Sequence, residues 1–148
     1  MRRFVFRLET VLRHRETVEE LCQQLFAQAQ SNYQQQQSRL RAIHEEFARV
    51  VAERPGNIGE PFDAHLIFDR ERYLETLQAA ITEQKQRVAS TRTVLDERRE
   101  ALLTARQARE SVSQLRDKDL ALHRESALKA EQEILDELAT MRHVRKAA

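Results

Sequence analysis

The sequence predicts an all-α fold: an antiparallel two-helix coiled-coil hairpin with unequal arms, in which the C-terminal helix overhangs. Both prolines and both glycines of the chain lie between residues 54 and 61, where they interrupt helix. A third of the residues are charged and 5% are aromatic, a composition typical of long helices rather than of a globular core. On both sides of the break, apolar residues recur at three- and four-residue spacing, which indicates a coiled-coil seam.

These observations predict one coiled-coil domain over residues 1–148. Its first helix is expected at about 4–53, its turn at 54–62 and its second helix at about 63–145, with Asp63 or a near neighbour as the cap. The second arm carries a seam with one apolar residue in every seven, at Leu74, Ile81, Val88, Leu95 and Leu102. The two seams match when paired residue numbers add up to roughly 120. In that register Gln36 faces Gln84, and the two side-chain amides can form a hydrogen bond.

The second arm is longer than the first, and the excess is rich in apolar residues. Helix beyond about Arg116 is expected to have no partner within the chain, since each residue adds only about 1.5 Å of length. Its apolar side chains are Leu120, Leu122, Leu128, Ile134, Leu135, Leu138 and Met141. An amphipathic helix of this kind predicts a partner protein, and the alternatives are a frayed end or pairing with a second copy.

Composition and motifs argue against several functional classes. The formal net charge is +1, which disfavours a nucleic-acid-binding protein, and a two-helix seam predicts no cavity for a small-molecule substrate. The five histidines are scattered and Cys22 is the one cysteine, so we expect no metal site, cofactor or internal disulfide. Phosphate-loop, nucleophile-elbow and dinucleotide motifs are absent, and no enzyme is predicted.

Location follows from two further expectations. The apolar run at the N-terminus is interrupted by Arg7 and Glu9, which is unlike a signal peptide. No stretch approaches the roughly 20 apolar residues of a membrane span. A cytoplasmic protein is therefore expected.

Both ends of the chain resemble one known family. The run Phe4-Val5-Phe6-Arg7-Leu8-Glu9-Thr10-Val11-Leu12-Arg13, continuing to Glu20, resembles the opening of FliJ-type flagellar export proteins. Their closing segment is similar to Arg116-Asp117-Lys118-Asp119, His123-Arg124-Glu125, Glu131-Gln132 and Leu135-Asp136-Glu137-Leu138-Ala139. The unequal hairpin matches the family as well, so that the resemblance covers essentially the whole chain.

The resemblance implies a cytoplasmic stalk of the type III export apparatus, peripheral to the inner membrane. Such a stalk binds the hexameric export ATPase through the end that bears the termini and an export-gate membrane protein through the turn end. It also has chaperone-escort duties, so export chaperones are further partners. The gate-binding face carries over to Tyr73, Leu77, Ala80 and Gln84. Gln84 departs from a histidine of some relatives, Leu77 also suits a core position, and Tyr73 also suits a partly covered flank.

The ATPase contact is assigned to the basic and apolar residues near the two ends. We expect it to involve Leu128, Leu135 and Leu138 together with Arg2, Arg3 and Arg7, because an unpaired apolar helix and basic termini suit a contact with a ring. One alternative is the equivalent stalk of a virulence-type secretion system. The other is a homodimeric coiled-coil scaffold in which the overhangs of two copies pair.

Overall fold

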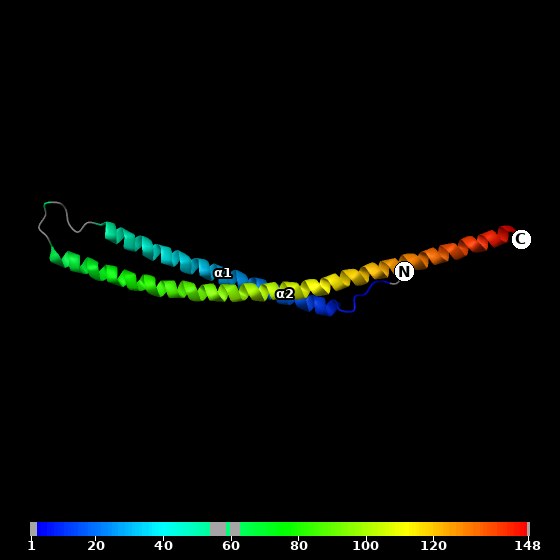
Figure 1. The fold of residues 1–148 in the computed structure, drawn as a ribbon, viewed down its shortest axis with the longest axis horizontal. Helices are drawn as coiled ribbons and strands as arrows, with labels where there is room; N and C mark the ends of the chain where they lie inside the picture. The colour runs from blue at the N-terminus through cyan, green and yellow to red at the C-terminus, as the bar shows by residue number, and fades with distance from the viewer. Residues whose placement is uncertain (1–2, 54–58, 60–62, 148) are drawn as a thin grey trace. The chain divides into compact units, whose positions relative to one another are not determined.

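The chain forms two long helices and, within the residues described, no strand. The computed structural model describes residues 3–53, 59 and 63–147, with side chains as far as Arg142. Helix α1 spans Glu9–Ala52 and helix α2 spans Ala64–Ala147, with 44 and 84 residues respectively (Figure 1). The two helices pack against each other, which confirms the predicted all-α hairpin with unequal arms.

The chain divides into two compact parts, each of which contains a section of both helices. The turn part is Cys22–Leu102, and the terminal part combines Met1–Leu21 with Leu103–Ala148. The assignment of both parts to one domain over residues 1–148 stays a prediction. Most of the predicted Pro- and Gly-containing turn lies outside the described residues. Gly59 is described and has a φ of 102°, a left-handed conformation that glycine adopts without a steric penalty.

The core of the turn part is a seam between α1 and α2. Its buried apolar residues are Val50, Leu77, Ile81, Leu95 and Leu102. Gln84 is the one buried polar residue in this seam among the residues described. Its Nε2 donates to Gln36 Oε1 at 2.8 Å and to the Gln36 carbonyl at 3.0 Å. This contact confirms the predicted pairing of the two glutamines and, in the turn part, the register in which paired residue numbers add up to about 120.

Helix α2 begins where the sequence predicts a cap. The backbone N–H of His65 donates to Asp63 Oδ1 at 2.9 Å. The first N–H groups of a helix have no partner within the helix, and an aspartate oxygen before the first turn satisfies one of them. Asp63 is therefore the N-cap of α2.

Helix α1 starts later than expected, at Glu9 instead of near residue 4. Residues 3–6 are not helical, and the Glu9 N–H donates to the Phe6 carbonyl at 3.3 Å in the turn that enters the helix. Phe6 is buried, and the ring of Phe4 meets the ring of His123 edge-on, with centroids 5.5 Å apart. Aromatic and β-branched residues have low helix propensity, and here the ring of Phe4 packs against α2.

The contact of the non-helical start with α2 corrects the expected limit at Arg116. We call residues 3–8 the N-terminal strap. The contact between Phe4 and His123 shows that α2 has an intrachain partner as far as His123.

An ion-pair cluster also joins the two helices in the terminal part. Arg109 Nε donates to Glu19 Oε2 at 2.6 Å, and Arg106 Nε lies 3.3 Å from Glu19 Oε1. The hydrogen bond to Glu19 raises the pKa of Arg109. One carboxylate of α1 thus holds two cations of α2, which lie one turn apart.

Candidate functional site

The residues predicted to bind the export gate differ in how far solvent reaches them. Tyr73 is 44% exposed and Ala80 is half-buried, whereas Leu77 and Gln84 are buried in the seam of the turn part. All four lie along one face of α2, as their spacing predicts. Helix α1 covers two of the four residues on that face, Leu77 and Gln84. A partner can reach Tyr73 directly, while Leu77 and Gln84 hold the two helices together.

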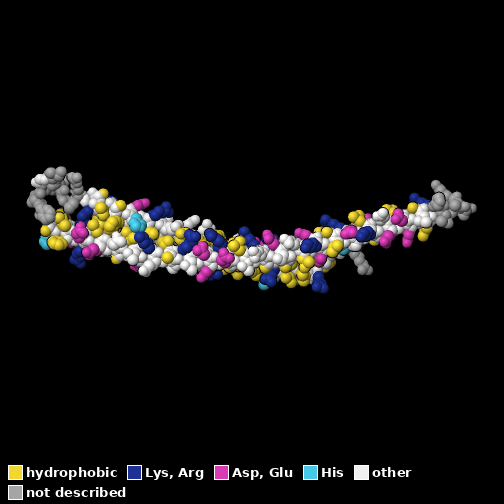
Figure 2. Space-filling model, viewed as in Figure 1, with side chains coloured by type: hydrophobic (Ala, Val, Ile, Leu, Met, Phe, Trp, Pro, Cys, Tyr) yellow, Lys and Arg dark blue, Asp and Glu magenta, His cyan; other side chains and the backbone are white. Residues whose placement is uncertain are grey.

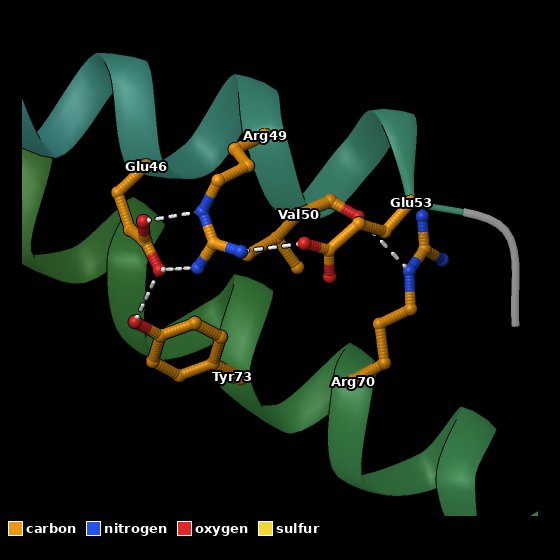
Figure 3. A network of polar contacts seen from close by, with 6 residues as sticks. All are labelled: Glu46, Arg49, Val50, Glu53, Arg70 and Tyr73. Atoms are coloured by element: carbon orange, nitrogen blue, oxygen red, sulfur yellow. Dashed lines mark hydrogen bonds and ion pairs between the residues drawn. The ribbon is translucent and has the colours of Figure 1, made fainter.

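The exposed ring of Tyr73 is held in place by a polar network with the end of α1 (Figure 3). Its hydroxyl donates to Glu46 Oε1 at 3.0 Å. Arg49 donates to both oxygens of the same carboxylate, at 2.6 and 2.9 Å, and also pairs with Glu53. The hydrogen bond to Glu46 raises the pKa of Tyr73, and those from Arg49 and then from Tyr73 lower the pKa of Glu46. Three polar side chains therefore orient the aromatic ring.

Arg70 connects α2 to the last turn of α1 in the same region (Figure 3). Its guanidinium donates to the carbonyls of Val50 and Val51, at 3.2 and 3.0 Å. These carbonyls belong to the final turn of α1, whose C=O groups lack partners within the helix and carry the negative end of the helix dipole. Arg70 is thus a C-terminal cap supplied by the other helix.

Replacing Arg70 with alanine is expected to loosen the end of α1. The two carbonyls lose a charged donor, and the cost should be about 1 kcal/mol because water replaces part of the hydrogen bonding. Amide exchange in the last two turns of α1 should accelerate, while exchange around Ile81 stays unchanged. Exposed Arg72, two residues along, provides the matched control: Arg72→Ala should leave α1 as it is. Equal protection in the Arg70 variant would contradict the capping role.

Two exposed apolar residues near the start of α2 were not among the predicted site residues. They are Leu66 and Phe68. Leu66 precedes Tyr73 by seven residues and therefore shares its helix face, whereas Phe68 lies on a different face. The sequence could have indicated Leu66 as a further site residue, because it is apolar and lies seven positions before Tyr73.

The residues predicted for the ATPase contact are exposed wherever the structure describes them. Leu128, Leu135 and Leu138 are 63%, 64% and 49% exposed. Arg3 and Arg7 are exposed on the N-terminal strap, and Arg2 lies outside the described residues. Ile134 and Met141 are exposed as well, so the apolar stripe is wider than the three leucines. Figure 2 shows hydrophobic side chains among charged ones along this stretch of α2.

Metal and membrane sites find no support in the described parts of the chain. No group of three or more His, Cys, Asp or Glu side chains is placed to hold a metal ion there. Within the same residues, neither helix has a stretch long and apolar enough to cross a membrane.

Comparison with known proteins decides the family. Residues 4–148 match the family described as flagellar FliJ protein. The chain belongs to the FliJ family. No match was found among curated proteins or among solved structures. The FliJ family comprises non-catalytic components related to flagellar export, and this FliJ-family chain therefore belongs with the flagellar export apparatus.

Proposed function

We propose that this FliJ-family chain is the stalk of the flagellar type III export apparatus. The terminal part binds the hexameric export ATPase, and the turn part binds the cytoplasmic domain of the export-gate membrane protein. The chain works in the cytoplasm at the inner membrane and also escorts export chaperones. The family supports the flagellar apparatus over a virulence-type one, because the match is to the flagellar protein.

The main observation in support of the ATPase contact is the uncovered apolar surface of α2 beyond Ala127. Leu128, Leu135 and Leu138 keep about half or more of their side-chain surface in water. Such a stripe costs free energy when it is exposed and is stabilised by a partner that removes it from water. Arg3 and Arg7 are exposed on the N-terminal strap and can add charge contacts at the same end of the hairpin.

The gate contact is proposed for the exposed edge of α2 in the turn part. Tyr73 is the anchor, since an exposed aromatic ring whose orientation is already restricted loses little entropy on binding. Ala80 lies two turns further along on the same face. Leu77 and Gln84 support this surface from the seam.

Removing the apolar stripe tests the ATPase contact. In Leu128→Ala/Leu135→Ala/Leu138→Ala, binding to the purified export ATPase and stimulation of ATP hydrolysis should fall more than tenfold. Each leucine contributes about 1.5 kcal/mol or more when buried, and 1.4 kcal/mol corresponds to a factor of about ten. Helicity by circular dichroism should persist, because alanine is a strong helix former.

A matched triple variant controls for the loss of exposed apolar surface in general. Leu21, Leu103 and Leu122 are exposed in the same part of the chain, and their replacement with alanine should leave ATPase stimulation within twofold of the unmodified chain. Full stimulation by the variant without Leu128, Leu135 and Leu138 would rule out the proposed contact.

The gate contact is tested at Tyr73 rather than at the buried positions. Tyr73→Ala should weaken binding to the cytoplasmic domain of the gate protein about tenfold, as truncation of an aromatic anchor does, and leave ATPase stimulation intact. Tyr73→Phe keeps the ring and removes only the hydrogen bond to Glu46, so it should bind nearly normally. If Tyr73→Ala binds the gate domain as tightly as the unmodified chain, this surface is not the contact.

A further inference from the structure

The uncovered stripe of α2 continues the face that packs against α1 and the strap. In the terminal part, the residues on that face are buried or half-buried at three- and four-residue spacing: Ala105, Arg109, Val112, Arg116, Leu120, His123 and Ala127. Beyond Ala127, the large apolar residues on the same face are Ile134, Leu138 and Met141, and these are exposed. Leu128 and Leu135, which are also exposed, lie beside this face and widen the stripe. The apolar pattern of α2 thus continues beyond the last residue that α1 or the strap covers. Burying these further apolar residues requires another surface.

Along the sequence, the charged residues of the overhang form two bands of opposite sign. An acidic band consists of Glu131, Glu133, Asp136 and Glu137, with no Lys or Arg between residues 130 and 141. Along the sequence it is followed by a basic band of Arg142, Arg145 and Lys146. The four acidic side chains are exposed, and none of them has an ion-pair partner among the described residues.

The acidic band destabilises the helix when it stands alone. Glu133 and Glu137 are four residues apart, and Glu133 and Asp136 are three apart. Like charges at these spacings face each other on a helix and cost a few tenths of a kcal/mol per pair. A surface that supplies cations at this level would remove the repulsion, so the charge pattern indicates the chemistry of what binds there.

We propose that the overhang of α2, residues 128–142, docks in an apolar groove whose rim is basic opposite residues 131–137. The proposal rests on the proposed function, in which this groove belongs to the export ATPase. The acidic band fixes the depth of docking, because shifting the helix moves its charges away from the basic rim.

A second copy of the chain fits this surface less well. The antiparallel register that sets Leu128 against Met141 and Ile134 against Leu135 also lays the acidic band along the acidic band of the other copy. A register that sets the acidic band against the basic band instead places Leu135 opposite Arg142. Neither arrangement satisfies the apolar stripe and the charges together.

Neutralising the acidic band tests the proposal. The variant Glu131→Gln/Glu133→Gln/Asp136→Asn/Glu137→Gln keeps the apolar stripe, and its affinity for the purified export ATPase is measured by calorimetry at low and at high salt. Affinity should fall about tenfold at low salt, and the dependence of affinity on salt should weaken, because the lost attraction is electrostatic. The control Glu45→Gln/Asp69→Asn/Glu75→Gln/Glu97→Gln makes the same charge change at exposed positions of the turn part and should retain affinity and salt dependence.

Each alternative result has a separate meaning. If the unmodified chain does not bind the ATPase, the proposed function fails. If it binds, and the neutralised variant binds equally well with the same salt dependence, the proposal of a groove with a basic rim is overturned while the proposed function stands. If light scattering finds a dimer that Leu128→Ala/Leu135→Ala/Leu138→Ala converts to a monomer, the occupant is a second copy and the proposal is overturned.

Discussion

Replacing Ile81 with alanine is expected to lower the free energy of unfolding by about 2–4 kcal/mol. Ile81 is 3% exposed in the seam of the turn part, one turn from both Leu77 and Gln84, which are also buried. A two-helix hairpin has no third layer from which side chains can move in to fill a cavity. The loss should appear as an earlier midpoint in urea unfolding followed by circular dichroism.

An exposed residue of the same part controls for shortening an apolar side chain. Val94 is 45% exposed, and Val94→Ala should change the free energy of unfolding by less than about 0.5 kcal/mol, as is usual at the surface. Similar losses in the Ile81 and Val94 variants would mean that the seam is not what holds the turn part together.

Replacing Gln84 with leucine is expected to destabilise the chain by about 1–3 kcal/mol, although leucine is the more apolar residue. Gln84 donates to the side chain and to the backbone carbonyl of Gln36. Without it, the Gln36 amide stays in the seam with part of its hydrogen bonding lost, and an unsatisfied buried group costs about this much.

The double variant Gln36→Leu/Gln84→Leu should recover that loss or exceed the stability of the unmodified chain. Replacing both members of a hydrogen-bonded polar pair within a seam with apolar groups is often neutral or stabilising. A double-mutant cycle in urea measures the coupling of the two amides, with exposed Gln37→Leu as the control. If Gln84→Leu alone is as stable as the double variant, the hydrogen bond between the helices contributes nothing.

Local sequence determined the helices of this protein and the way they pair in the turn part. Proline and glycine stop a helix through their own backbone chemistry, and the apolar spacing on both sides is a property of neighbours three and four residues apart. The cap at Asp63 and the contact between Gln36 and Gln84 follow from the same patterns once the two arms are folded back at the turn. Family membership was also visible in the sequence, because the motifs of both ends occur in order.

Tertiary structure alone decided where α1 begins. Phe4 lies four residues before Leu8 and fits the apolar spacing of a helix, but residues 3–6 are not helical. Phe6 is buried there, and the ring of Phe4 meets His123 of α2. The choice depends on a surface more than a hundred residues away in the chain, and local patterns carry no information about such a contact. The same holds for the capping of α1 by Arg70 and for the two cations at Glu19.

Tertiary structure likewise separated supporting residues from accessible ones within the candidate site. Tyr73, Leu77, Ala80 and Gln84 share one helix face by spacing, and spacing cannot say how far α1 covers that face. Burial of Leu77 and Gln84, and exposure of Tyr73, follow from how α1 packs on α2. Periodicity defines the face of a helix, and only the packing of the neighbouring helix decides which residues of that face a partner can reach.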